Sequence, residues 1–393
     1  MRPDPSAPAE PALLARVRAR LAAEEERPTP ARVAAALRAE GRILGDRALL
    51  EVVESLRSEM VGAGPLDPFL RDPRVTDVLV NGPDSVWVDR GDGLERVAVR
   101  FRDEAAVRHL AQRLAALAGR RLDDAIPWCD APLPDGVRFH AVLPPVARSG
   151  TALSLRVAAR RAFNLPQLVS AGTVTAAGAG WLQALVSARL SFLVSGGTGS
   201  GKTTVLAALL GLVDPAHRLV VVEDTAELAP DHPHVVCLET RPPNVEGAGG
   251  VGLRDLLRQA LRMRPDRVVV GEVRGSEVCD LLAAFNTGHE GACGTLHANT
   301  AVDVVARLEA LSALGGMSRE ALHAQVAAGL DAVVHLGRGP GGRRVVDTVG
   351  VLRREGADHV SVVPAVRLHP EVALAEAAPA LVRRLGRFAP QPG

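Results

Sequence analysis

Residues 190–210 read LSFLVSGGTGSGKTTVLAALL, an apolar run, a glycine-rich turn and a second apolar run. The turn matches the pattern G-x-x-x-x-G-K-[ST] from Gly196 to Thr203. The run before it predicts a strand and the run after it predicts a helix, which is the context of a phosphate-binding loop. Lys202 in this loop is the only lysine of the chain. A compact ammonium fits among phosphate oxygens in a way that a planar guanidinium does not.

Composition limits the class of protein. With 393 residues the chain exceeds what one hydrophobic core usually serves, so we expect two folded domains and a small appendage. The net charge of +1 gives no global electrostatic reason to bind nucleic acid or an anionic membrane surface. The four cysteines lack C-x-x-C spacing, so neither a disulfide framework nor a zinc site is predicted.

Targeting signals are also missing from the sequence. It has no uncharged apolar stretch of about 18 residues, and the start of the chain, residues 1–10, is proline-rich and acidic, unlike a signal peptide. We therefore expect a cytoplasmic protein.

The first part of the chain divides into a helical segment and a small α+β domain. Residues 1–60 predict helices over 11–26, 30–40 and 46–60, either as an appendage that packs on its neighbours or as a docking arm. Residues 61–157 predict short strands with turns between them, and a helix over 104–118. The predicted strands are 75–80, 85–88, 94–101, 138–143 and 152–157. Residues 158–166 are the predicted linker.

Residues 167–370 predict an α/β domain, because apolar runs alternate with helical patterns and so imply a largely parallel sheet covered by helices. We expect strands near Leu190, Leu219, Val268, Cys293 and Val333, and helices that start near Thr203, Leu253, Ser276, Ala301 and Ser318. Residues 337–342 predict a hairpin turn before a further strand over 345–352. The tail, residues 371–393, is rich in Ala and Pro and is predicted to be flexible.

The loop pattern predicts how a nucleoside triphosphate and magnesium are held. Backbone N–H groups and the helix N-terminus face the phosphates, Lys202 reaches the β and γ phosphates, and the Thr203 hydroxyl ligates Mg²⁺. The predicted nucleotide-binding residues are Gly196, Gly197, Thr198, Gly199, Ser200, Gly201, Lys202, Thr203 and Thr204.

Two further apolar runs end in acidic residues, at the sheet edge where α/β folds bind ligands. Glu223 is the candidate general base, supported by Asp224, although an acidic pair at a strand end is also common in solvated loops. Glu272 ends the run 267–272 and is the candidate Mg²⁺ ligand, acting through water, with a share in placing the nucleophile. Arg274 has two open roles, a phosphate contact or a partner of Glu272.

A fourth apolar run lies in GHEGACGTLHAN, residues 288–299, and ends at His297. From the same sheet edge His297 can donate to the γ phosphate and respond to its loss, but a purely structural histidine is the alternative. His289 precedes the strand and is a weaker candidate. A zinc site would need a third ligand at metal spacing.

Four motifs in this order and spacing resemble the type II/type IV secretion and pilus-assembly ATPase superfamily. EDTAEL at 223–228 resembles its Asp box, LRMRPD and VGEVRG within 261–275 its Walker B region, and the segment from NTGH to HAN, 286–299, its His box. DHPHVV at 231–236, RPPN at 241–244 and VNGPD at 80–84 resemble the Tad/Flp pilus (tight-adherence) or conjugal-transfer-associated branch. The tetracysteine zinc module of type II secretion ATPases is missing, which disfavours that branch.

The resemblance implies a RecA-like P-loop domain in a homo-hexameric ring, with ATP and Mg²⁺ as cofactors. It also implies that the small N-terminal domain closes over the nucleotide and contributes arginines. LPDGVR at 133–138 and LSLR at 153–156 match those positions, so Arg138 and Arg156 are charge-neutralising candidates, or else ordinary surface arginines. The expected partner is an inner-membrane platform protein of a pilus or secretion apparatus, at the inner face of the cell membrane.

Two other functions remain open at this stage. One is a conjugation or helicase-like motor that grips DNA directly, which an aromatic content of only 3% disfavours. The other is a nucleotide-gated scaffold that hardly hydrolyses, against which Glu223 and Glu272 argue. We favour an ATP-hydrolysing motor that powers pilus assembly, secretion or conjugal transfer, with direct nucleic-acid binding not expected.

Overall fold

The chain divides into two units, Met1–Arg160 and Arg161–Gly393, each with its own hydrophobic core. The structure is a computed structural model that describes residues 16–17, 20, 29–40, 49–50, 52–53, 62–91, 93–133, 136–157, 163–241, 243, 247–356 and 359–390. Most of the predicted helices 11–26 and 46–60 lies outside these residues. Of the predicted linker 158–166, residues 158–162 lie outside them, and helix α6 (Leu165–Ser170) already begins at Leu165.

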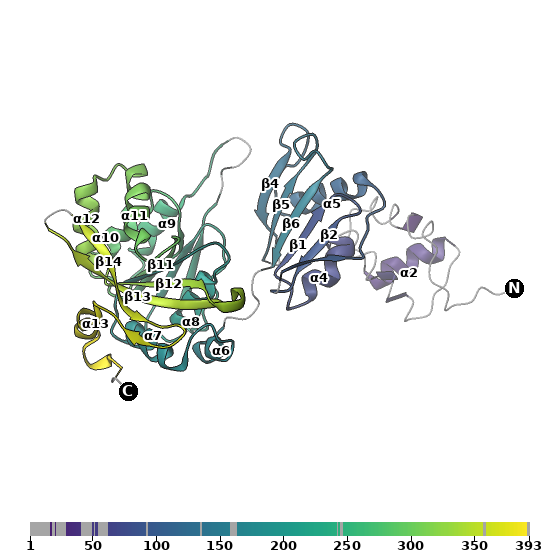
Figure 1. Ribbon diagram of the computed structural model, residues 1–393. Coiled ribbons are helices and arrows are strands. Elements are labelled where there is room, and N and C mark those ends of the chain that lie inside the picture. Colours follow the sequence, from purple (N-terminus) through teal and green to yellow (C-terminus); the bar gives the residue numbers. More distant parts are fainter. Residues whose placement is uncertain are drawn as a thin grey trace. The chain divides into compact units, whose positions relative to one another are not determined.

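An antiparallel sheet of six strands forms the first unit, in the order β3-β2-β1-β6-β5-β4 (Figure 1). Its strands are β1 (Asp77–Asn81), β2 (Val86–Asp89), β3 (Leu94–Val97), β4 (Trp128–Pro132), β5 (Val137–Val142) and β6 (Ala152–Val157). Side chains alternate between two faces, so Val137 and Phe139 are buried while Arg138 lies on the other face. Helix α5 (Glu104–Leu117) packs on the buried face, and the Asp103 carboxylate caps it by accepting from the Ala106 N–H.

Two predictions for this sheet need correction. The strand predicted over 94–101 ends at Val97, because Val97 pairs with Val86, the first residue of β2, so β2 has no further residue for it to pair with. The edge strand β4 was not predicted. Its pattern is short and includes Pro132, a residue that a sheet tolerates mainly at its edge.

The helical part before the sheet has a small core of its own. Helix α2 (Pro30–Ala39) corresponds to the predicted helix 30–40, and its Val33 and Leu37 pack with Val17 and Val52. A 3-10 turn, η1 (Gly64–Leu66), and α4 (Asp67–Arg71) then lead into β1.

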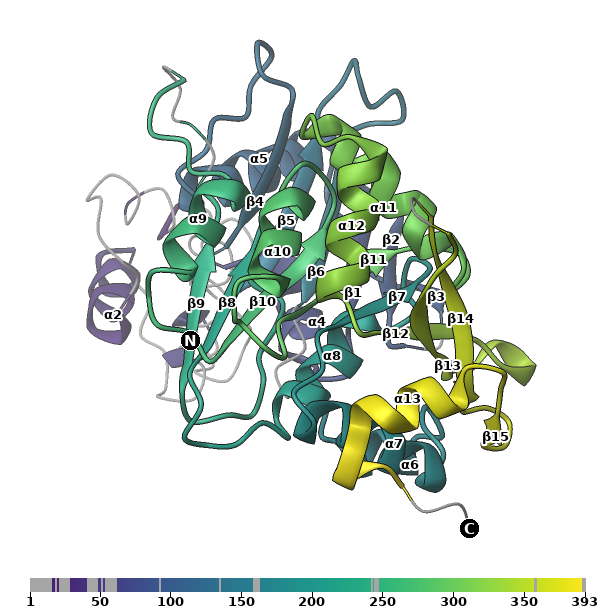
Figure 2. The same ribbon diagram turned by 90° about the vertical axis from the view of Figure 1, so that its left-hand side faces the viewer.

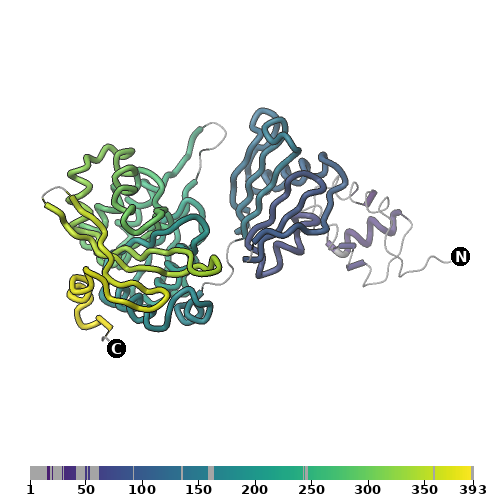
Figure 3. The backbone as a smooth tube through the Cα atoms, in the orientation of Figure 1, coloured from purple at the N-terminus to yellow at the C-terminus, as the bar shows by residue number. Residues whose placement is uncertain are grey.

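A sheet of nine strands forms the second unit, in the order β15-β14-β13-β12-β7-β11-β10-β8-β9. The neighbours from β12 to β9 pair in parallel, whereas β13, β14 and β15 are added by antiparallel pairing. The strands are β7 (Phe192–Gly196), β8 (Leu219–Glu223), β9 (Val235–Glu239), β10 (Arg267–Val273), β11 (Cys293–His297), β12 (Ala332–Arg338), β13 (Arg344–Arg354), β14 (Val360–Arg367) and β15 (Ala373–Leu374). Figure 3 shows the chain turning through η2 (Pro340–Gly342) between β12 and β13.

Helices cover both faces of this sheet (Figure 2). One face, called here the loop face, packs against α6, α7 (Ala176–Ser187), α8 (Lys202–Leu210) and α13 (Ala378–Leu385). The opposite face packs against α9 (Leu253–Ala260), α10 (Val278–Phe285), α11 (Asp303–Leu314) and α12 (Arg319–Gly329). Successive residues of each central strand alternate between these faces, as Leu193 and Val194 do in β7.

The end of the chain differs from the flexible tail predicted over 371–393. Residues 373–374 form β15, residues 378–385 form α13, and the 3-10 turn η3 (Gly386–Phe388) follows. Leu381 and Leu385 are almost fully buried against the loop face. The Ala- and Pro-rich composition hid an amphipathic helix, because two leucines four residues apart suffice to bury one side of it.

Candidate functional site

The phosphate-binding loop connects β7 to α8 in a conformation that requires glycine at two positions. A β-carbon on Gly196 would come within 2.7 Å of Ser200 Oγ and 2.8 Å of the Leu336 carbonyl oxygen. Gly201 precedes the first residue of α8 and has a φ of +94°, in the left-handed region that favours glycine. The loop is thus a closed backbone turn at the N-terminus of a buried helix.

Lys202 is held against this turn. Its side chain is 8% exposed, and Nζ donates hydrogen bonds to the carbonyl oxygens of Gly196 and Gly197, both at 3.1 Å. Burial lowers the pKa of Lys202, and the negative charge of Glu272 acts in the opposite direction. The single ammonium of the chain therefore lies inside the loop and within electrostatic range of the predicted Mg²⁺ ligand.

The loop fits a phosphate group. The Ser200 hydroxyl is buried and lacks a hydrogen-bond partner among the residues that the structure describes. On the other side, a β-carbon on Gly197 or Gly199 would meet no atom within 4 Å, so this surface of the turn is open. An anion seated there would face backbone N–H groups and the helix N-terminus.

His297 is the direct neighbour of the loop in the sheet. In the parallel pairing of β7 with β11 and β12, Gly196 lies opposite His297 on one side and Leu336 on the other. Leu336 packs on the loop face, so His297, in the same row, points to that face as well. The structure thus places the predicted histidine beside the first glycine of the loop.

Glu223 is the last residue of β8, and its side chain lies on the loop face, as those of Leu219 and Val221 do. It is 4% exposed, and its Oε1 accepts hydrogen bonds from the N–H groups of Leu228 at 3.0 Å and Glu227 at 3.2 Å. Burial raises the pKa of Glu223 to about 7, although the two N–H donors lower it. A carboxylate with this pKa is suited to general base catalysis near neutral pH.

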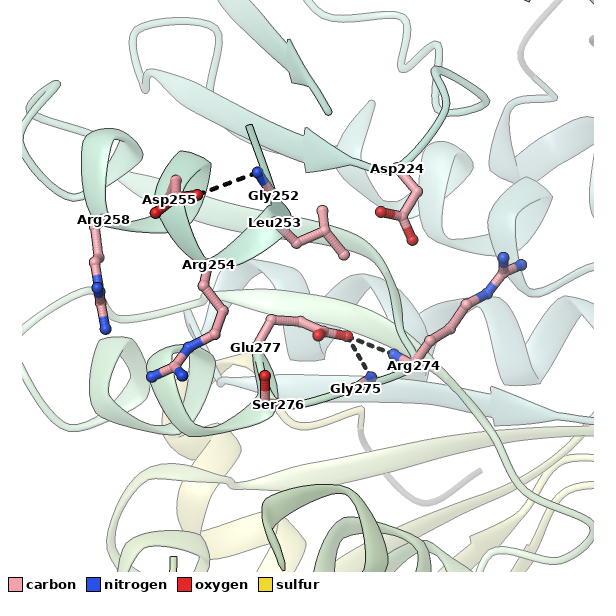
Figure 4. Close-up of a pocket in the computed structure, with 10 residues that line it drawn as sticks. All are labelled: Asp224, Gly252, Leu253, Arg254, Asp255, Arg258, Arg274, Gly275, Ser276 and Glu277. Atoms are coloured by element: carbon pink, nitrogen blue, oxygen red, sulfur yellow. Dashed lines mark hydrogen bonds between the residues drawn. The ribbon is translucent and has the colours of Figure 1, made fainter. Parts of the chain in front are cut away.

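Asp224 follows Glu223 at the end of β8 and lines a cavity. Two backbone N–H groups hold Glu223, while Asp224 lines a cavity of about 570 Å³ together with the start of α9 and the turn between β10 and α10 (Figure 4). Around this cavity, Arg254 and Arg258 share the carboxylate of Asp280. The residues of the phosphate loop do not line the cavity, so the phosphate site lies apart from it.

A bulge in β10 redirects Glu272. Val270 and Val273 both pack on the face opposite the loop, although strict alternation would put them on different faces, and the pairing with β11 shifts between them. An extra residue in a strand re-aims the side chains beside it. The Thr295 hydroxyl donates to the Gly271 carbonyl at 2.6 Å and thereby satisfies a group inside the bulge.

Arg274 is an ion-pair partner of Glu272 in this structure. Its Nε donates to Glu272 Oε2 at 2.8 Å, and an Nη atom contacts the same oxygen. Of the two roles left open by the sequence, the structure shows the pairing with Glu272. Both side chains are partly exposed, so the pair is accessible to a ligand.

Arg138 and Arg156 belong to the first unit, where they are direct cross-strand neighbours on β5 and β6. Arg138 forms a two-point contact with Asp130, at 2.9 and 3.2 Å, and Arg156 Nε lies 3.4 Å from Asp77 Oδ1. The two predicted arginines are thus adjacent on the sheet face opposite α5, and each is paired with an aspartate.

Sequence reasoning missed three residues that the topology brings to the phosphate loop or to Glu223. Gly271 provides space for Glu223, Arg344 passes its Cδ beside Gly201, and His335 forms a hydrogen bond with Ser195. The last two lie on the β12–β13 hairpin, far from the loop in sequence. Only the strand order places them there, and a single sequence gives no signal for it.

Two observations concern metals and membranes. Among the described residues, no group of three or more His, Cys, Asp or Glu side chains is arranged to hold a metal ion without further ligands. The helices in the same part of the chain include none with the length and apolar character of a membrane span.

The chain matches the family described as "Type II/IV secretion system protein" over residues 59–348. It is 57% identical over 318 residues to a putative conjugal transfer protein of Mycobacterium tuberculosis, covering 79% of this chain and 90% of that protein. Conjugal transfer protein TrbB of Rhizobium radiobacter is 34% identical over 287 residues, covering 72% and 85%. The fold is similar to that of the pilus retraction motor PilT with bound ADP (TM-score 0.52, 20% identity, 82% of this chain and 86% of PilT). The resemblance seen in the motifs is confirmed, and the chain belongs to the type II/IV secretion system protein family.

Proposed function

We propose that this protein is a P-loop ATPase with a RecA-like second unit, which converts ATP and water into ADP and phosphate. One observation carries the proposal. Lys202 at the start of α8 lies against the phosphate loop, His297 ends the neighbouring strand β11, and Glu223 ends β8 on the same face of the sheet. The open side of the loop fits phosphate. PilT, which has a similar fold, was crystallised with ADP.

The chain's own residues divide the chemistry between them. The loop from Gly196 to Thr204 binds the phosphates, and Lys202 exchanges its two carbonyl contacts for phosphate oxygens. The Thr203 hydroxyl, and the Glu272 carboxylate through water, would hold Mg²⁺, which would neutralise phosphate charge. Glu223 takes a proton from the attacking water, since its buried carboxylate is poised near neutral pH. His297 donates to the γ phosphate from the neighbouring strand.

Arg138 and Arg156 complete the site when the first unit closes over the nucleotide. Guanidinium groups that arrive only on closure make hydrolysis depend on a movement, and this dependence is the basic step of a motor. We therefore propose a homo-hexameric ring at the cytoplasmic side of the cell membrane. Its partner is a membrane platform of a pilus, secretion or conjugal transfer apparatus, in keeping with the conjugal transfer proteins to which the chain is similar.

A paired substitution tests the ATPase activity. Lys202→Ala should abolish turnover by weakening phosphate binding, whereas Glu223→Gln should bind nucleotide normally and lose turnover, because only the base is removed. Phosphate release and the affinity for a fluorescent ATP analogue would be measured on the full chain. Wild-type protein that does not turn over ATP would overturn the proposal. A Glu223→Gln variant with full turnover would overturn only the assignment of Glu223 as the base.

Assembly and substrate class need their own measurement. Sedimentation with a non-hydrolysable ATP analogue should show a species close to six subunits, and a monomer with full turnover would contradict the ring. Hydrolysis that DNA stimulates strongly would favour a motor acting directly on nucleic acid, for which the net charge of +1 gives no support.

A further inference from the structure

A buried histidine lies beneath the phosphate loop and has no part in the chemistry described above. His335 on β12 is 7% exposed, and its Nδ1 lies 2.9 Å from the hydroxyl of Ser195. Ser195 is fully buried and directly precedes Gly196, the first residue of the loop. A side chain from another part of the chain therefore contacts the loop's own strand at the point where the strand ends.

The position of His335 follows from the strand register. Ser195 lies opposite Leu296 on β11 and opposite His335 on β12, so these three residues form a row directly before the row of His297, Gly196 and Leu336. Leu296 packs on the face covered by α9–α12, and alternation puts Ser195 and His335 on that face. His335 thus contacts the loop strand from the side opposite α8.

A second contact joins His335 to the turn after β11. The backbone of Asn299, two residues after His297, forms a hydrogen bond with His335 that favours the protonated ring nitrogen. Because a carbonyl oxygen only accepts, the ring donates to Asn299, and its other nitrogen accepts from the Ser195 hydroxyl. The His335 ring therefore links the end of β7 to the turn after β11.

The surroundings keep this ring neutral. Burial lowers the pKa of His335, while the carboxylates of Asp347 on β13 and Asp303 at the start of α11 act in the opposite direction. Thr348 of β13 lies opposite His335 in the sheet and carries no charge. A neutral imidazole has one donor and one acceptor, which matches one carbonyl and one hydroxyl.

We propose that His335 is a positioning residue that ties the phosphate loop to the turn after His297, so that a nucleotide-dependent shift of His297 reaches α11. The proposal rests on the ATPase function proposed above. Ala298 and Ala301 in that turn are buried against the layer of α10–α12, so the turn and the helical layer move together. The proposed coupling thus runs from the nucleotide site to the helices that cover the sheet face opposite the loop face.

The test compares two buried histidines in the full chain. His335→Leu removes both hydrogen bonds, whereas His335→Gln can supply one donor and one acceptor again. The matched control is His323→Leu on α12, because His323 is also buried and also has two partners, Glu309 and the Val360 N–H, but lies away from the loop. ATP turnover, nucleotide affinity and the melting temperature are measured for each variant.

We expect His335→Leu to lower kcat by about tenfold, with nucleotide affinity changed by less than about threefold, since a misplaced group costs rate more than binding. His335→Gln should recover most of this rate, and His323→Leu should lower the melting temperature while leaving kcat near that of the wild type. If His335→Leu does not fold, Ser195→Ala removes one of the two bonds with a smaller change and should lower kcat in the same direction.

Several outcomes would overturn the proposal. These are an unchanged kcat in His335→Leu or in Ser195→Ala, a loss in His335→Gln as large as in His335→Leu, or an equal loss in His323→Leu. Lys202→Ala serves as the reference for the ATPase function itself. If the wild type hydrolyses ATP and Lys202→Ala does not, an unaffected His335→Leu refutes only the positioning role, whereas an inactive wild type refutes both.

Discussion

Glu223 lies against the α-carbon of Gly271, and a β-carbon there would come within 2.5 Å of Glu223 Cγ and 2.8 Å of its Oε1. The candidate base on β8 therefore occupies the space that a side chain at position 271, on the neighbouring strand β10, would fill. A β-carbon essentially never lies this close to a non-bonded atom, so a larger residue at position 271 must displace the carboxylate.

Gly271→Ala should consequently lower ATP turnover by about tenfold or more, because the base moves away from the attacking water. Nucleotide affinity should remain close to that of the wild type, since the phosphate loop is untouched. Gly337→Ala is the matched control, because its β-carbon would meet only Asp347 Cβ at 3.7 Å, an ordinary contact. Equal turnover in the two variants would show that Glu223 has room to move without loss.

The pH profile should report the burial of Glu223. The base acts in its ionised form, so a pKa raised to about 7 predicts that kcat/KM for ATP falls as the pH decreases below 7. The expected slope is about tenfold per pH unit on the acidic side, with a plateau above about pH 8. Steady-state phosphate release, measured between about pH 5 and pH 8, gives this slope. Denaturation is checked at each pH. A profile that stays flat down to pH 5 would assign the base to another group.

Arg138 and Arg156 of the first unit should affect the rate of ATP hydrolysis. Arg138→Ala or Arg156→Ala should each lower turnover by about tenfold, if these groups neutralise charge in the transition state. The double variant should lose less than the product of both effects, because the two side chains are direct neighbours on β5 and β6. Arg100→Ala is the control, since Arg100 is 76% exposed and only loosely paired with Asp84. A double variant with full turnover would identify both as surface residues.

Helix α13 should contribute to the stability of the second unit. Leu381→Ala removes a fully buried side chain from the core of the loop face and should cost about 2–5 kcal/mol of unfolding free energy. Val382→Ala, one residue further and 39% exposed, should change the free energy of unfolding by less than about 1 kcal/mol. Chemical denaturation with two spectroscopic probes compares them. Equal midpoints would mean that α13 does not pack as described.

The sequence predicted most of the central strands and the acidic residues at their ends, because long apolar runs and a glycine-rich loop are local signals. It did not predict the bulge after Val270, since a register shift depends on the partner strand β11 and not on the run itself. The neighbourhood of His335 and Ser195 likewise depends on β12 lying beside β7. Helix α13 was missed because its composition resembles a flexible tail, and only burial of Leu381 and Leu385 shows otherwise.

The position of Lys202 has a practical consequence for counting occupied sites. Its Nζ is the only side-chain amine of the chain, and burial lowers its pKa, which increases the fraction of reactive free amine. An acylating reagent therefore has one lysine target per subunit, and this target lies inside the phosphate loop. A ligand that occupies the loop shields this amine. The fraction of Lys202 that carries a label, determined by mass spectrometry of peptides from the treated assembly, then reports the fraction of subunits whose loops are empty.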